Sequence, residues 1–210
     1  MLLTTSELYT HAVAKSADEM KTGGGTTGKT GFLQWRNKAL PMLDINYRWS
    51  PVVLDARGNG GRSADEMKAL AYKGYGPEDG VHAGDRAPDA PALVDAAGAE
   101  TALFDIFKPY RHTVLLFVGA DEKAVAEVVE VAQRWPAGRA EVVILGSDAV
   151  PATVGGTRAY HDKGHHAFDA YHIGTGTFAA VVVRPDGYVG AFVYGAEGVR
   201  EYFAKIFKTA

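Results

Sequence analysis

Residues 23–30 match a known catalytic pattern more closely than any other part of the sequence, reading Gly-Gly-Gly-Thr-Thr-Gly-Lys-Thr. The order fits the glycine-rich loop in which backbone amides, a lysine and a hydroxyl surround nucleotide phosphates. That loop needs a buried apolar strand before it and a helix after it, whereas residues 16–22 are polar and helix-like. We therefore interpret residues 23–30 as a loop rich in glycine and threonine, and rank nucleotide binding third among three candidate functions.

Histidines form the second group of residues with possible chemistry. His161, His165, His166 and His172 fall within twelve residues, and imidazoles with nearby carboxylates are common ligands for zinc, nickel or copper. His161 and His165 have the spacing of two ligands on one helical face, but Gly164 lies between them. We favour a solvent-facing segment without a metal, and His161, His165 and His166 are the candidate ligands if one binds.

The chain contains no cysteine. Disulfides, Cys-x-x-Cys redox pairs, peroxidatic thiolates and thiolate zinc sites are therefore excluded. The sequence also places no two carboxylates at a spacing suited to general acid–base catalysis. We predict no catalytic residue on this chain.

Aromatic and cationic side chains adjoin at Tyr47, Arg48 and Trp49, within residues 44–54, which read as extended chain. One interpretation is a ligand site. We favour the other, in which an extended segment packs on a folded core. Together with Trp35, these three residues are our candidates for the contact surface of an N-terminal arm.

The sequence divides near residue 80. Residues 1–80 are irregular, with short helical and extended stretches, and bury too little apolar surface to fold alone, so we expect them to pack on another surface. Residues 81–210 follow an α/β pattern in which apolar runs alternate with amphipathic stretches. We expect strands at 92–94, 113–118, 141–145, 178–183 and 188–194, the last two forming an antiparallel hairpin, and helices at 101–107, 122–135, 164–171 and 197–207.

Composition restricts the class of partner. The chain is 47% hydrophobic and 22% charged with a net charge of −3, which is typical of a globular protein and gives no sign of a nucleic-acid or anionic-membrane surface. It has neither an apolar run of about 18 residues nor a basic flank followed by an apolar segment at its start. We expect a cytoplasmic protein with no nucleic-acid or membrane partner.

Several segments carry a family resemblance. Residues 84–90 read Gly-Asp-Arg-Ala-Pro-Asp-Ala, residues 103–107 read Leu-Phe-Asp-Ile-Phe, and residues 183–190 read Val-Arg-Pro-Asp-Gly-Tyr-Val-Gly. With the strand at 113–117, their order resembles the C-terminal thioredoxin-like domain of FAD-dependent aromatic-ring hydroxylases, the relatives of phenol hydroxylase and hydroxyphenylpropionate hydroxylase. Residues 46–51 resemble the stretch by which those enzymes leave their flavin-binding domain, which has no counterpart here.

The resemblance implies an α/β fold, a thioredoxin-like mixed sheet with helices on both faces, preceded by the irregular arm. In thioredoxins the redox cysteines follow the strand that corresponds to 113–118, where this sequence has Gly119-Ala120-Asp121-Glu122. Thioredoxins also carry a cis-proline before the strand that corresponds to 178–183, where this sequence has Gly176-Thr177. Both departures imply that the redox site is lost.

The resemblance also implies a function. It suggests a redox-inactive tail of a flavin-dependent aromatic monooxygenase, serving oligomerisation or docking to a flavin-bearing partner, and not catalytic by itself. FAD is implied for the full-length family but no cofactor for this chain, because Gly58, Gly60 and Gly61 precede no apolar helix. The expected partners are a second copy in a homodimer or a flavin-domain protein in trans. The alternative is a protein that binds a small aromatic molecule on the same fold, near Tyr47, Trp49 and Tyr188.

Overall fold

The structure is a computed structural model that describes residues 45–58, 61–71, 80–118, 122–136 and 138–207. The chain separates into two units, Met1–Leu43 and Asp44–Ala210, and the described residues all belong to the second. The phosphate-loop motif at 23–30 and Trp35 therefore lie outside the described residues.

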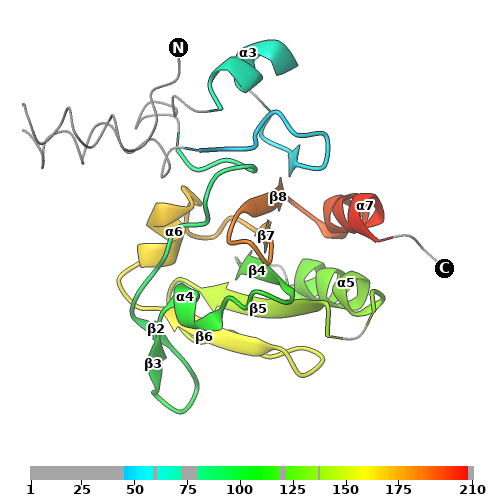
Figure 1. The fold of residues 1–210 in the computed structure, drawn as a ribbon. Coiled ribbons are helices and arrows are strands. Elements are labelled where there is room, and N and C mark those ends of the chain that lie inside the picture. Colours follow the sequence, from blue (N-terminus) through cyan, green and yellow to red (C-terminus); the bar gives the residue numbers. More distant parts are fainter. Residues whose placement is uncertain (1–44, 59–60, 72–79, 119–121, 137, 208–210) are drawn as a thin grey trace, which may run out of the picture. The chain divides into compact units, whose positions relative to one another are not determined.

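A mixed eight-stranded sheet is the framework of the described chain, with the strand order β1-β8-β7-β4-β5-β6-β2-β3 (Figure 1). β4 runs parallel to β5 and antiparallel to β7, β5 runs parallel to β6, and β7 and β8 form the predicted antiparallel hairpin. The strands are β1 Leu54–Asp55, β2 Leu93–Val94, β3 Glu100–Thr101, β4 His112–Val118, β5 Ala140–Gly146, β6 Arg158–Asp162, β7 Ala179–Val183 and β8 Val189–Val193.

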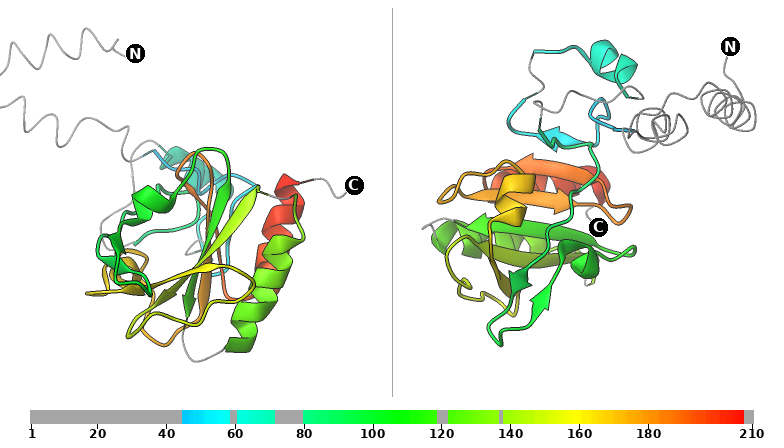
Figure 2. Two further views of the ribbon diagram at one scale, coloured as in Figure 1. Left: turned by 90° about the horizontal axis from the view of Figure 1, so that it is seen from below. Right: turned by 90° about the vertical axis from the view of Figure 1, so that its left-hand side faces the viewer.

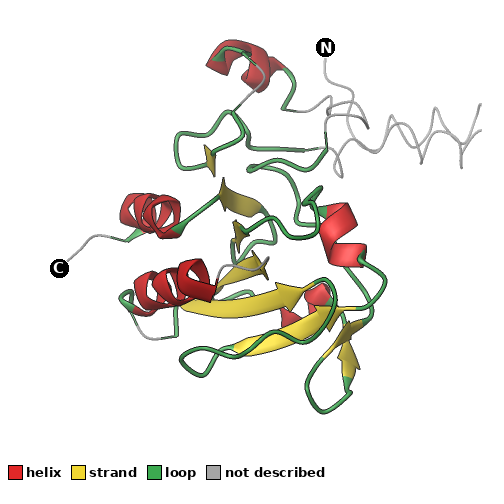
Figure 3. Cartoon of the chain, turned by 180° about the vertical axis from the view of Figure 1, so that it is seen from behind, coloured by secondary structure: helices red, strands yellow, loops and turns green. Residues whose placement is uncertain are grey.

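Helices cover both faces of the sheet, as predicted. α5 and α7 lie next to each other on one face, while α4 and α6 lie on the other (Figures 2 and 3). The fifth described helix, α3, buries none of its residues and starts at a capping box between Ser63 and Glu66. The helices are α3 Ala64–Ala69, α4 Leu103–Ile106, α5 Glu122–Gln133, α6 His166–Ala170 and α7 Ala196–Ile206.

Alternation along β4 divides the interior into two cores. Leu115 and Phe117 point into the core below α4 and α6, whereas Val114 and Leu116 point into the core below α5 and α7. All four are fully buried. A strand buried on both faces reads as one continuous apolar run, which is why the sequence predicted β4 so clearly.

Three short strands, β1, β3 and β6, were not predicted. β6 contains Arg158, His161 and Asp162 among its five residues, so it lacks the apolar run by which β4 and β5 were identified. β1 and β3 have two residues each; β1 pairs with the distant strand β8, and β3 pairs with the nearby two-residue strand β2. Such strands carry almost no local signal.

β1 precedes the boundary that we predicted near residue 80, yet it pairs with β8. The structure thus groups residues 45–71 with the α/β region in one compact unit. The boundary near residue 80 stays a prediction, because residues 1–44 and 72–79 lie outside the described residues.

The packing of α7 on β8 gives a stability test. A Cβ added at Gly190 in β8 would overlap the hydroxyl oxygen of Tyr202 and lie 2.5 Å from its Cζ atom, and Tyr202 is fully buried. We expect Gly190→Ala to lower the free energy of unfolding by about 1–3 kcal/mol, measured by urea denaturation. Gly195→Ala is the matched control: its backbone is extended and no atom lies within 4 Å of the added Cβ. If both variants lose the same free energy of unfolding, the close contact between Gly190 and Tyr202 does not restrict the packing of α7 on β8.

Candidate functional site

The outer edge of β8 is the place where N-terminal segments join the sheet. β1 pairs with β8 in parallel, and the amide of Ala56 donates to the carbonyl of Phe192 over 2.8 Å. Nearer the start of β8, Gly84 donates to the carbonyl of Val189 over 2.7 Å, and Val189 donates back to Asp85 over 2.8 Å. Two segments far apart in sequence thus share one strand edge.

The Asp55 carboxylate holds these two segments together. Its Oδ2 lies 3.0 Å from His82 Nδ1 and accepts a 2.9 Å hydrogen bond from the amide of Ala83. Arg57 donates to both carboxylate oxygens, from Nε over 3.1 Å and from Nη2 over 3.0 Å. The Arg57 guanidinium also lies 3.4 Å from the ring centroid of Phe192 in β8. This group of residues links β1, the loop at 81–83 and β8.

Burial by itself would raise the pKa of the Asp55 carboxyl group. The hydrogen bonds from His82, Arg57 and the amide of Ala83 outweigh that effect and hold the pKa well below its usual value. The charged carboxylate is therefore the form that the folded chain stabilises.

A second ion pair attaches the preceding residues. Arg48 donates from Nε to Asp85 Oδ1 over 2.7 Å and from Nη2 to Oδ2 over 2.6 Å, the two-pronged geometry that makes such pairs strong. The same Nη2 also donates to the carbonyl of Gly80 over 3.1 Å. Both side chains of the pair are largely buried.

Gly84 permits a close backbone approach beside this pair. The amide of Tyr47 donates to the Gly84 carbonyl over 2.7 Å. Gly84 has a φ of +101°, and a Cβ there would lie 2.6 Å from the Cα of Arg48. Only glycine combines this left-handed backbone with this approach, so the string at 84–90 has a structural role here.

The four predicted contact residues differ in where the structure places them. Tyr47 packs edge-on against Tyr188, with ring centroids 4.8 Å apart, and Arg48 makes the ion pair described above. Trp49 lies beside Lys68, whose Nζ is 5.7 Å from the ring centroid. Trp35 lies outside the described residues. The role of these side chains in contacts with another molecule stays a prediction.

The histidine candidates lie on different elements. His161 is in β6, His165 has a left-handed backbone with a φ of +59°, and His166 begins α6, so the helical spacing does not apply. Asp162 between them is fully buried and accepts hydrogen bonds from the amides of Ala167 and Phe168 at the start of α6. Within the described ranges, no three His, Cys, Asp or Glu side chains form a group that could hold a metal ion.

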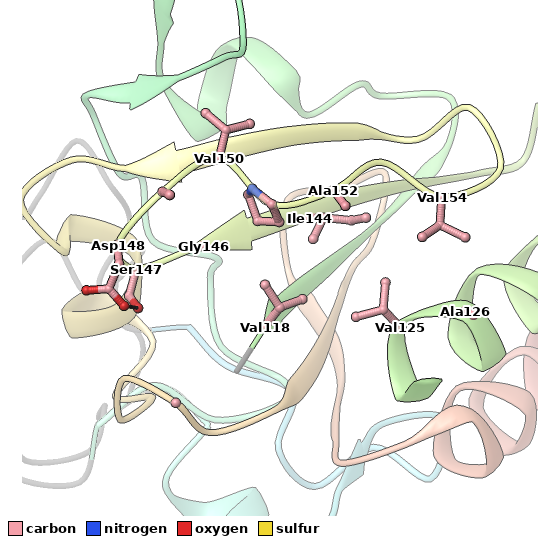
Figure 4. A pocket seen from close by; sticks show the side chains of 13 residues that line it. Val118, Val125, Ala126, Ile144, Gly146, Ser147, Asp148, Val150, Ala152 and Val154 are labelled. Carbon is pink, nitrogen blue, oxygen red and sulfur yellow. Dashed lines mark hydrogen bonds between the residues drawn. The ribbon is translucent and has the colours of Figure 1, made fainter. Parts of the chain in front are cut away.

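A pocket of about 690 Å³ lies at the carboxyl ends of β4 and β5. Val118 and Ile144 come from these strands, Val125 and Ala126 from α5, and most of the remaining lining from the loop at 147–154 (Figure 4). The sequence analysis did not find it. The sequence feature that could have indicated the pocket is the apolar character of the loop at 147–154, which contains Ala149, Val150, Pro151, Ala152 and Val154.

Dinucleotide binding does not fit the glycines after β1. A site for FAD of the kind that the resemblance implies needs a buried strand, a tight glycine turn and a helix packed on the sheet. Gly58 and Gly61 instead lie between β1, which has two residues, and α3, which has six residues and none buried.

In the part of the chain that the structure describes, no helix has the length and apolar character needed to cross a membrane.

Comparison with known proteins supports the resemblance. Residues 147–210 match the family model described as "Phenol hydroxylase, C-terminal dimerisation domain". The structure is similar to the flavin-dependent monooxygenase PieE, solved with FAD and substrate, at a TM-score of 0.53 and 16% identity, covering 95% of this chain and 36% of that one. The resemblance to the aromatic hydroxylase tail is confirmed.

The thioredoxin-like fold is confirmed as well. A domain of a possible thiol-disulfide isomerase from Cytophaga hutchinsonii is similar at a TM-score of 0.51 and 16% identity, covering 60% of this chain and 94% of that domain. No curated protein matches the sequence of this chain.

The Asp55 group predicts a pH dependence. The folded state keeps this pKa below the unfolded value of 3.8, so its contribution to stability is fully present above about pH 5 and is lost as the pH falls through the folded pKa. We expect Asp55→Asn to lower the free energy of unfolding at pH 7 by about 2 kcal/mol and to flatten its decline between pH 5 and 2. Urea denaturation across this range measures both effects.

Asp148→Asn serves as the control, because that side chain belongs to an exposed residue far from β1 in the sheet order. It should leave the profile close to that of the parent chain. If Asp55→Asn behaves like Asp148→Asn, the Asp55 group does not stabilise the fold.

Proposed function

We propose that this chain is a redox-inactive, thioredoxin-like tail of a flavin-dependent aromatic monooxygenase, acting in oligomerisation or in docking to a flavin-bearing partner. The observation that carries the proposal is the match of residues 147–210 to a dimerisation-domain family. That segment follows the end of β5 and includes β6, α6, the β7–β8 hairpin and α7. It therefore contributes strands to the middle of the sheet and one of the two helices on its α5–α7 face.

Cysteine content supports the redox-inactive part of the proposal. Thiol–disulfide exchange and peroxide reduction by this fold both require a thiolate, and this chain has no cysteine. Flavin chemistry would come from a partner, because the described glycines after β1 do not fit a dinucleotide. An absorption spectrum of the purified chain should accordingly lack the flavin bands.

A surface within the matched segment suits contact with a second copy. Three large apolar side chains are exposed among the described residues: Phe104 at 58%, Tyr110 at 62% and Tyr194 at 51%. Only Tyr194 falls within residues 147–210, directly after β8 and before α7. Aromatic residues are enriched at protein interfaces because they bury a large area at low entropic cost. We place Tyr194 in the dimer contact.

The mass in solution tests the proposal. We expect the chain at micromolar concentration to sediment as a dimer of two 22.4 kDa protomers. Tyr194→Glu should weaken the dimer at least tenfold, because a carboxylate would have to lose its water at the interface. Tyr110→Glu is the matched control, a more exposed tyrosine outside the matched segment, and should leave the dimer intact.

Two outcomes would count against it. A parent chain that stays monomeric at high micromolar concentration would contradict self-association. A dimer that Tyr110→Glu disrupts and Tyr194→Glu does not would place the interface on the α4 side of the fold instead.

A further inference from the structure

We propose that the pocket at the carboxyl ends of β4 and β5 binds a small apolar molecule carrying a neutral or cationic hydrogen-bond donor, with the Asp148 carboxylate as acceptor. This inference is independent of the oligomerisation proposed above. It concerns a different surface, and either proposal can fail without the other.

The volume and walls of the pocket suit such a ligand. Its volume of about 690 Å³ lies within the range of about 300–1,000 Å³ that is usual for small-molecule sites. Val118, Val125, Ile144 and Val154 contribute aliphatic surface from a strand, a helix, a second strand and a loop. Transfer of an apolar group from water to this surface is favourable by roughly 25 cal/mol per Å² buried.

Among the described lining residues, the polar side chains lie at one end of the pocket. Figure 4 shows Ser147 and Asp148 at one end, and Val125 and Ala126 at the other. Ser147 Oγ donates to Asp148 Oδ2 over 2.9 Å, which orients the carboxylate while leaving Oδ1 able to accept a further hydrogen bond. A ligand with one polar end and one apolar end matches this division.

The loop that closes the pocket is fixed before any ligand arrives. At its start, a Cβ on Gly146 would overlap the carbonyl oxygen of Ala149 and lie 2.7 Å from Cγ of Pro151, so the chain folds tightly back on itself there. At its far end, Gln133 Nε2 of α5 donates to the Gly155 carbonyl over 3.0 Å. Because both ends of the loop are held, little ordering entropy is lost on binding.

Charge determines which polar group the pocket accepts. Among the described lining residues there is one carboxylate, Asp148, and no lysine, arginine or histidine. An ammonium or hydroxyl group can donate to Asp148, and an ammonium gains Coulomb attraction as well. A ligand carboxylate would meet a like charge, and no cationic side chain among the described lining residues would offset it. The pocket should therefore discriminate against organic acids.

Three probes of one shape separate these cases: 2-naphthylmethylammonium, 2-naphthalenemethanol and 2-naphthoate. Titrated into the 15N-labelled full chain, the cation and the alcohol should shift the amide resonances of Val118, Ile144 and Val150. Naphthoate should bind at least tenfold more weakly than the cation. Equal affinity for all three probes, or shifts centred elsewhere, would overturn the proposal.

Two variants make the assignment specific. Ala126→Trp places a large side chain at an exposed position of α5 that lines the pocket, and should reduce binding of the cation and the alcohol at least tenfold. Ala204→Trp, at an exposed position of α7, is the matched control and should bind as the parent chain does. Unchanged binding in Ala126→Trp would remove the pocket as the site.

Asp148→Asn tests the acceptor separately. The amide oxygen still accepts a hydrogen bond from the alcohol, but the negative charge is gone. We expect the ratio of cation to naphthoate affinity to fall toward one while the alcohol stays within about threefold of its parent affinity. A ratio that does not change would show that Asp148 does not select the ligand.

Discussion

The outer edge of β8 imposes the constraint on which the N-terminal part of the described structure depends. A strand at the edge of a sheet exposes backbone donors and acceptors that must be paired or protected, because an open edge invites aggregation. Here β1 covers one part of that edge and residues 84–87 cover another. The segments at 45–58 and 80–87 are therefore parts of the sheet and not only a connection leading into it.

Ionic contacts fix these two segments where hydrogen bonds alone would be few. β1 has only two residues, too few to stay paired by their own ladder. Asp55 and Arg57 bind the loop at 81–83 and the ring of Phe192, and Arg48 binds Asp85. The charged side chains of Arg48, Asp55, Arg57 and Asp85 are thereby engaged in contacts that hold these segments on the sheet.

The sequence predicted those parts of the fold whose signal is local. β4, β5 and the two strands of the β7–β8 hairpin are apolar runs, and α5 and α7 are amphipathic. The hydrophobic pattern of each element was therefore enough to predict it. β1 pairs with a strand more than 130 residues away in sequence, β6 pairs with β5 and with the distant β2, and the pocket depends on a loop folding back at Gly146. The less favoured alternative, two histidine ligands on one helical face, does not apply, because His161 lies in a strand and His165 in a turn before α6.

Native-state hydrogen exchange at the β8 edge tests the central claim, that the segments before residue 88 are integral to the thioredoxin-like module. The amides of Ala56, Gly84 and Val189 each donate across this edge. The account predicts that they exchange with the same free energy as the amides of β7, close to that of global unfolding. Exchange of Ala56 and Gly84 at the rate of an exposed loop, with β7 still protected, would show that these segments open independently and would contradict it.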